Sequence, residues 1–316
     1  MSVAACLLLY SFAVAVVAPR LLPRWTRTGA APRLGVTAWL VAIGSVPASW
    51  FAATAFLVVE LVRDWNRPGG IVGTCFAALQ VVAVGGAGVV LQFGLFTLTA
   101  LVLGGAAVLA VRLGRSLVRA RSRTHDHARM ARVVGRRIPG SDAVVLDAPE
   151  RLAYCVAGRP DTIVVTSGAL DALDDHHLDA VLAHERAHLA GRHHLLLAAT
   201  RGLAAVLPRV GLFATGATEI ARLVEMCADD EAARDHGSRT VLGALLALSG
   251  AASLPTGALG ATGVGVLARA ERLAEPAGLR RRMYTRLSLA TVVTLLAVGP
   301  VLAAVGVSLC DPSALY

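Results

Sequence analysis

The feature that most constrains this fold is a stretch from Ile71 to Val111 that contains no charged residue. Further apolar runs cover residues 2–18, 34–62 and 287–309, and Glu60 is the one charge within them. A helix needs about 20 such residues to cross the hydrocarbon core of a bilayer. The mean hydropathy of +0.65 and the charged fraction of 16% make the chain too apolar for an ordinary soluble domain. The sequence therefore predicts a mainly α-helical membrane protein with a polar insert.

The distribution of arginine predicts how the chain crosses the membrane. Four arginines lie within residues 20–33, and nine lie within residues 112–137. Cytoplasmic loops of membrane proteins are enriched in basic residues, so both stretches are expected inside the cell. Two crossings must then separate them, one at 34–62 and one near 92–111. The second stretch lacks interleaved aromatic residues, so we expect it to lie near anionic lipid headgroups of the bilayer and to make no direct contact with nucleic acid.

The remaining crossings complete a prediction of about four transmembrane helices. Residues 2–18 form the first, with the N-terminus outside, and the last apolar run exits outward again. Residues 71–90 are expected as an external, re-entrant or surface-lying segment. Cys75 and Cys310 then lie on the same outer side, where an oxidising environment favours a disulfide between them.

Two further apolar stretches are not expected to cross the membrane. Residues 195–213 are interrupted by arginines and a proline, which favours a position along the membrane surface. A crossing at 241–267 would place the arginine-rich residues 279–286 outside, against the positive-inside rule. We therefore expect packed helices and a loop near the bilayer there.

Three short β-branched runs, in residues 141–147, 151–158 and 161–170, follow the basic stretch. Proline and glycine separate the runs, so they predict a small antiparallel sheet. An edge strand at Leu152–Val156 could bind an extended peptide by β-augmentation. The alternative is that these strands merely cover the following helix, and the sequence leaves both readings open.

The sequence VLAHERAH at residues 181–188 carries the chemistry. On a helix that starts near Asp174 or Asp175, His184 and His188 lie one turn apart and can offer their imidazoles to one ion. Glu185 follows the first histidine, where its carboxylate could deprotonate a water at the metal and later protonate a leaving amine. The alternative is a pair of surface histidines on an amphipathic helix.

A catalytic zinc site usually has three protein ligands, so a third must come from elsewhere. The sequence EMCAD offers Glu225 as that ligand, on a second helix. Asp229, one helical turn later, could accept the other ring N–H of a ligating histidine. Taken alone, a glutamate with an aspartate four residues later is usually a solvated helix face. Its occurrence downstream of HERAH, in a membrane-embedded chain, makes the pair more specific.

Taken together, TIVVTSGALDAL, LDAVLAHERAHLAGRHHLL and VEMCADDEAA resemble the BlaR/MecR type of integral-membrane zinc peptidases, which are related to HtpX-type heat-shock proteases. The resemblance is close over residues 162–233. It implies an α+β metalloprotease core that uses Zn²⁺ and faces the cytoplasm. It also implies that His184, His188 and Glu225 are zinc ligands, that Glu185 is the general base and that Asp229 orients a ligand.

The expected spans and the protease core divide the chain into three regions: transmembrane residues 1–113, a cytoplasmic protease domain at 114–283, and a final span with a short outer tail at 284–316. Antibiotic-sensing members carry a large penicillin-binding domain after the last span. Residues 311–316 stand in its place here, so we expect no direct sensing of a β-lactam by this chain.

The function expected is a zinc endopeptidase in the plasma membrane that cleaves a protein substrate. By the resemblance, that substrate is a cytoplasmic transcriptional repressor in a signalling pathway. One alternative is an HtpX-like quality-control protease, and another is a catalytically silent membrane signalling protein. A lid or a homo-oligomeric seal over the active site is compatible with the sequence, which indicates neither.

Overall fold

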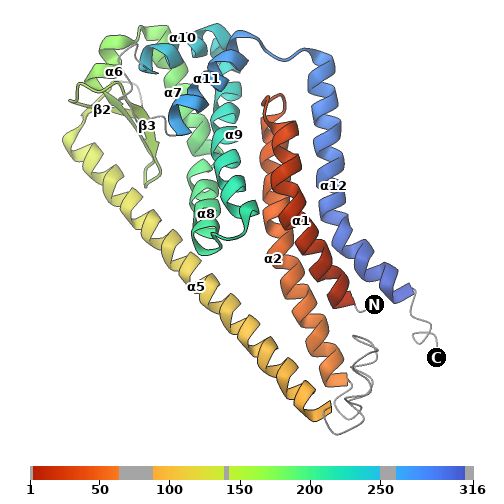
Figure 1. The fold of residues 1–316 in the computed structure, drawn as a ribbon. Helices are drawn as coiled ribbons and strands as arrows, with labels where there is room; N and C mark the ends of the chain where they lie inside the picture. Colours follow the sequence, from red (N-terminus) through yellow and green to blue (C-terminus); the bar gives the residue numbers. More distant parts are fainter. Residues whose placement is uncertain (1–2, 64–87, 139–141, 250–260, 310–316) are drawn as a thin grey trace.

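The computed structural model describes residues 3–63, 88–138, 142–249 and 261–309. Long helices extend from one end of the molecule, and a small sheet with shorter helices occupies the other (Figure 1). The mainly helical architecture with a small sheet agrees with the sequence-based prediction.

Three helices are long and apolar enough to cross a membrane: α1 (Val3–Thr26), α2 (Pro32–Arg63) and α12 (Leu279–Leu309). They pack side by side, and the first residues of α1 and the last residues of α12 lie at the end remote from the sheet (Figure 1). Tyr10 of α1 donates a hydrogen bond of 2.7 Å to the carbonyl oxygen of Leu296 in α12. Three apolar helices in one bundle suggest a membrane protein.

Helix α5 (Gly88–Val134) covers both the expected span at 92–111 and the arginine-rich stretch in one continuous run of 47 residues. It diverges from α2 and returns to the sheet (Figure 1). Leu101 and Val108 are among the large hydrophobic side chains that it exposes. Helix α5 is not one of the three candidate spans among the described residues, so a fourth span stays a prediction. Residues 64–87 and 310–316, which include both cysteines of the expected disulfide, lie outside the described part of the chain.

The sheet has four strands in the order β1-β2-β4-β3, formed by Arg136–Arg137, Ala143–Leu146, Thr162–Thr166 and Ala153–Val156 respectively. The prediction of an antiparallel sheet is confirmed for the pairs β1–β2 and β3–β4. It was wrong for β2 and β4, which pair in parallel with Ala143 opposite Ile163. The chain leaves β2, forms the edge strand β3 and then inserts β4 between the two. The fully buried β4 gains both neighbours in this order, whereas an up-and-down order would leave it at an edge. The expected edge strand at Leu152–Val156 is confirmed as β3.

The shorter helices cover one side of the sheet and connect it to the bundle (Figure 1). They are α6 (Ser167–Ala172), α7 (Asp175–Ala190), α8 (His193–Val206), α9 (Gly211–His236), α10 (Ser238–Ser249) and α11 (Ala261–Ala274). The stretch 241–267 thus contributes to α10 and α11, which pack on each other as expected. None of these helices is a candidate span in the described ranges.

Helix α9 joins the sheet end to the apolar bundle. Its first half buries Leu212, Phe213 and Ile220 in one core with Trp39 of α2, which is fully buried. The two helices approach closely at Gly216, where a Cβ atom would lie 2.6 Å from the Cδ1 atom of Ile43. The second half of α9 then continues beside α7. The packing that buries α9 against α2 therefore also fixes the position of its C-terminal half.

Candidate metal centre

The HERAH sequence lies on α7, whose start is fixed by Asp174. The Asp174 carboxylate accepts a hydrogen bond of 2.8 Å from the backbone N–H of His177, as an N-cap residue does. This agrees with the predicted start near Asp174 or Asp175. Val181 and Leu182 face the core, and His184 and Glu185 are each only 9% exposed. The two central residues of the motif are therefore buried, which argues against a pair of surface histidines.

His184, His188 and Glu225 converge at one point between α7 and α9. Their ligand atoms all lie within 4.8 Å of one another. The Nε2 atom of His184 lies 3.5 Å from Oε2 of Glu225, and the Nε2 atom of His188 lies 3.5 Å from Oε1. The structure thus brings together the three residues that the sequence singled out as ligands.

The opposite ring nitrogens of the two histidines also have partners. The Nδ1 atom of His184 lies 3.1 Å from Oδ1 of Asp229, and the Nδ1 atom of His188 lies 2.9 Å from Nδ1 of His193. A histidine that binds a metal through Nε2 carries its proton on Nδ1, and that proton needs an acceptor. Asp229 occupies the position expected from the sequence. His193 provides the second acceptor.

Arg269 of α11 contacts both carboxylates of α9. Its Nε and Nη2 atoms donate hydrogen bonds of 2.8 and 2.7 Å to Asp229, and Nη1 donates one of 3.1 Å to Oε2 of Glu225. Asp229 is fully buried, so a cationic partner is needed to offset the cost of removing its charge from water. Arg269 therefore fixes the side chains of Asp229 and Glu225 relative to each other.

The electrostatics of the cluster favour a cation. Burial lowers the pKa of His184, but hydrogen bonds to Asp229 and Glu225 outweigh it and raise that pKa to about 9. Burial raises the pKa of Glu225, but hydrogen bonds from His184 and His188 hold it well below its usual range. Burial and the neighbouring His188 lower the pKa of His193 to about 4, so His193 is neutral and can accept a hydrogen bond from the Nδ1–H of His188.

This donor set fits zinc. Two imidazole nitrogens and one carboxylate are a known ligand combination of catalytic zinc sites, which leave a fourth position open. Each of the three groups is supported on its far side by a further polar residue: Asp229, His193 or Arg269. Such supporting contacts hold the ligands in the orientation that binding requires.

Glu185 lies beside the cluster at a small cavity of about 180 Å³. Burial raises the pKa of the Glu185 carboxyl, and Cys155 of β3 lies within hydrogen-bonding reach of it. Polar groups of α7, α9 and α11 line one part of the cavity. Its apolar wall comes from α7, α10 and β3 and consists of Ala180, Val181, Val241, Ala244, Leu245, Leu248 and Ala153.

Two residues of this cluster are not evident from the sequence. His193 does not share the four-residue spacing of His184 and His188, so the sequence favours a solvent-exposed or supporting role for it. Its position five residues after His188 is the one sequence signal that could have indicated its contact with His188. Arg269 carries no local signal of its own. The need of the buried Asp229 for a cation could have suggested an arginine, but nothing local distinguishes Arg269 from the other arginines of the chain.

Comparison with known proteins agrees with this geometry. Residues 118–254 match the model of Peptidase family M48. No curated protein and no solved structure matched the chain. The matched segment contains the sheet, α7 and the whole of α9, which carries Glu225 and Asp229. The match supports a zinc-dependent metallopeptidase, because peptidases of this family depend on a metal that is typically zinc.

Proposed function

We propose that this chain is a membrane-anchored zinc endopeptidase that cleaves a protein substrate at the cytoplasmic face of the membrane. The observation that carries the proposal is the convergence of His184, His188 and Glu225 beside the buried Glu185, within the segment that matches Peptidase family M48.

His184, His188 and Glu225 would hold the zinc through two Nε2 atoms and one carboxylate. Zinc at this site supplies Lewis acidity, which polarises the scissile carbonyl and increases the acidity of water. Asp229 and His193 keep each imidazole in the tautomer that leaves Nε2 free, because each accepts a hydrogen bond from an Nδ1–H group that keeps its proton. Arg269 anchors the carboxylates of Glu225 and Asp229 and so limits their rotation.

Glu185 acts as the general base in this proposal. Its carboxylate takes a proton from the attacking water and passes it to the amine that leaves when the peptide bond breaks. Burial raises the pKa of the Glu185 carboxyl, which makes its carboxylate a stronger base toward the proton of the water.

The substrate peptide is proposed to bind along β3. This strand is at the edge of the sheet, contacts α7 and contributes Ala153 to the wall of the cavity beside Glu185. An extended peptide that paired with β3 would pass Glu185 and could place an apolar side chain between Val241 and Leu245. Backbone pairing gives affinity with little side-chain preference, and the apolar wall adds selectivity at one position.

The cytoplasmic orientation rests on the distribution of arginine. The turn between α1 and α2 and the first turns of α12 carry arginines at the end nearest the sheet. A reporter that is active only in the cytoplasm, fused near Gly140, tests this placement. Activity of an exclusively periplasmic or extracellular reporter at that position would contradict it.

Two versions of the proposal differ in the class of substrate that the peptidase cleaves. We favour one cytoplasmic repressor as the substrate, on the sequence resemblance, with HtpX-like quality control as the alternative. Comparison of new protein N-termini in cells that carry the wild-type chain or Glu185→Gln separates them. A few soluble substrates would support regulation, whereas many membrane-protein fragments would support quality control.

The catalytic proposal is tested with purified full-length protein in neutral detergent and a fluorescently labelled unstructured protein such as casein. Glu185→Gln should keep its zinc but lose about 10²–10⁴-fold in cleavage rate, as expected when a general base is removed. Glu271→Gln, on the exposed face of α11, makes the same chemical change outside the site and should cleave normally. If Glu185→Gln cleaved the labelled protein at the wild-type rate, the assignment of Glu185 as the base would be refuted. If the wild-type chain were catalytically silent, cells with the wild-type chain and cells with Glu185→Gln would show the same protein N-termini.

A further inference from the structure

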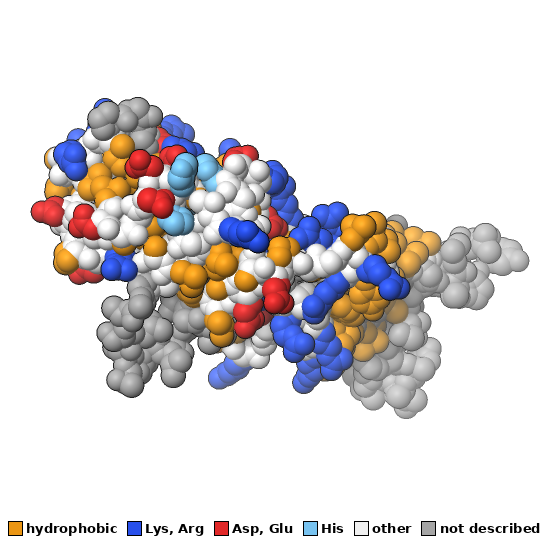
Figure 2. Space-filling model, turned by 90° about the horizontal axis from the view of Figure 1, so that it is seen from above, with side chains coloured by type: hydrophobic (Ala, Val, Ile, Leu, Met, Phe, Trp, Pro, Cys, Tyr) orange, Lys and Arg blue, Asp and Glu red, His pale blue; other side chains and the backbone are white. Residues whose placement is uncertain are grey.

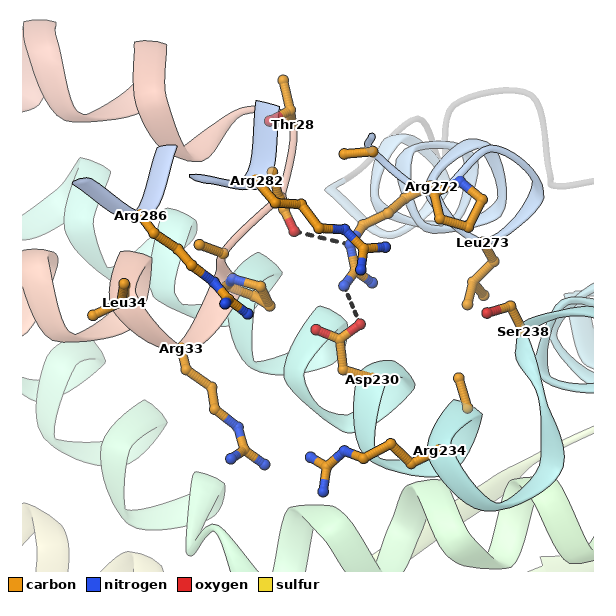
Figure 3. A pocket seen from close by; sticks show the side chains of 17 residues that line it. Thr28, Arg33, Leu34, Asp230, Arg234, Ser238, Arg272, Leu273, Arg282 and Arg286 are labelled. Atoms are coloured by element: carbon orange, nitrogen blue, oxygen red, sulfur yellow. Dashed lines mark hydrogen bonds and ion pairs between the residues drawn. The ribbon is translucent and has the colours of Figure 1, made fainter. Parts of the chain in front are cut away.

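A second and larger cavity, of about 690 Å³, shares no lining residue with the cavity beside Glu185. The lining of this larger cavity is drawn in Figure 3. It is formed where the turn between α1 and α2 meets α9, α11 and the first turns of α12. Its charged lining consists of Arg33, Arg234, Arg272, Arg282, Arg286 and Asp230. Five guanidinium groups and one carboxylate therefore share one hollow.

Three of these arginines have acidic partners. Arg272 pairs with Asp230, and its Nε atom also donates a hydrogen bond of 2.9 Å to the carbonyl oxygen of Gly29. Arg33 and Arg234 both pair with Glu231, which lies outside the lining. These contacts hold α11 and α9 against the turn that joins α1 and α2.

Arg282 and Arg286 have no acidic partner among the residues that the structure describes. They lie four residues apart on α12, so they share a helix face, and both side chains extend toward the cavity (Figure 3). Like charges at this spacing repel each other slightly. Among the residues that the structure describes, Asp230 in the lining and Glu231 outside it pair with three of the five arginines. The cavity therefore keeps a surplus of positive charge that an anion would offset.

The position of the cavity bears on the kind of anion. It adjoins the end of α1, the start of α2 and the residues just before the apolar run of α12. Basic side chains gather where the polar helices meet the apolar ones (Figure 2). Residues at such a level face the headgroups of a bilayer. Arginines that served only to orient the spans would not need to line one cavity, so the hollow points to a bound group.

We propose that this cavity binds a phosphate-bearing anion through Arg282 and Arg286, with Arg272 at its inner wall. Guanidinium groups bind phosphate oxygens in a bidentate manner, which makes arginine suited to such sites. A volume of about 690 Å³ admits a phosphate with substituents, as in a phospholipid headgroup or a soluble phosphate compound. The site does not depend on the proposed peptidase activity.

The chain provides a matched control for a test of this site. Arg280 and Arg281 lie on the same turn of α12, are exposed and do not line the cavity. The pair Arg280→Gln/Arg281→Gln removes the same charge from the same end of the same helix as Arg282→Gln/Arg286→Gln. Surface electrostatics and helix orientation are therefore altered equally, and only the cavity differs.

The experiment measures binding to purified full-length protein in neutral detergent. The probes are a fluorescent phosphatidylglycerol in mixed micelles and, separately, inorganic pyrophosphate by calorimetry. The cavity pair should weaken binding by about tenfold or more, and the control pair by less than about twofold. Variants are compared only if they elute and melt like the wild type, which is expected because both target side chains are exposed.

The probes also distinguish the two sources of phosphate. Binding of the lipid that pyrophosphate does not displace identifies a headgroup site, whereas pyrophosphate binding that depends on the cavity pair identifies a site for soluble phosphate. Either result supports the proposal. Equal weakening by the two pairs, unchanged binding by the cavity pair, or no binding of either probe to the wild type would overturn it.

Discussion

Replacement of Arg269 by methionine should destabilise the protein strongly. The guanidinium group donates two hydrogen bonds to Asp229 and one to Glu225, and Asp229 has no exposed surface. Methionine keeps an unbranched chain but leaves the Asp229 carboxylate without its main cation. Removal of one partner of a buried ion pair costs about 3–5 kcal/mol, because the other charge stays buried without that partner. The imidazole of His184, 3.1 Å from Asp229, remains beside the carboxylate but replaces neither of the hydrogen bonds that Arg269 donates. At about 2 °C per kcal/mol for a chain of this size, the melting temperature should fall by about 6–10 °C.

The assay is thermal unfolding of the full-length protein in neutral detergent with a chelator present. Metal-free protein is used because Arg269 has two opposite effects on zinc binding: its charge repels the ion, but its hydrogen bond positions Glu225. Without metal, loss of Arg269 can only lower the stability of the protein. Asp229→Asn in the Arg269→Met background removes the uncompensated charge and should restore at least about half of the loss.

A variant Arg269→Met that melts within about 1 °C of the wild type would refute this reasoning. A double variant with Asp229→Asn that melts lower than Arg269→Met would refute it as well, because the loss would then not come from an unpaired charge. Arg269→Lys offers a further comparison. It keeps the charge but cannot reach both carboxylates with a planar group, so a partial loss is expected.

Three further outcomes follow from the same structure. His193→Ala should lower zinc affinity about tenfold, whereas substitution of the exposed His194 by alanine should not. Competition with a chromophoric chelator measures the affinity. Equal effects of the two variants would contradict the role of His193 in orienting His188. Gly216→Val should lower the free energy of unfolding by about 1–3 kcal/mol, because the new Cβ atom would meet Ile43. Gly211→Val is the control, since a Cβ atom at Gly211 meets nothing within 4 Å. Equal melting temperatures of the two variants would contradict the close approach of α9 and α2. Removal of metal by phenanthroline should abolish cleavage of the labelled protein, and added zinc should restore it; cleavage that survives removal of the metal would exclude a metallopeptidase.

The part of the metal centre that depends on local helix geometry could be predicted from the sequence. His184 and His188 share a face because they lie four residues apart, and Glu225 and Asp229 do so for the same reason. The cap at Asp174 follows from equally local chemistry. Local geometry does not explain why α7 and α9 meet; the sequence indicated that contact only through the occurrence of EMCAD downstream of HERAH and through the family resemblance.

The part that depends on distant segments could not be predicted. Arg269 lies 40 residues beyond Asp229, and its selection from many arginines depends on where α11 packs. The parallel pairing of β2 with β4 likewise depends on which strand takes the centre of the sheet, since the three strand sequences are similarly apolar. Burial accounts for both features: the buried carboxylate of Asp229 pairs with an arginine, and the fully buried strand β4 pairs with a strand on each side.

Helix α9 makes the metal centre and the apolar bundle one packing unit. Its first half is buried against α2, and Arg222 at its middle donates a hydrogen bond of 2.9 Å to the carbonyl oxygen of Thr26 at the end of α1. Glu225 follows Arg222 by one turn of the same helix. Because packed interiors resist small continuous shifts, Glu225 cannot move relative to α1 and α2 without repacking this buried face. The position of a proposed zinc ligand is therefore set by the helices that are candidates to cross the membrane.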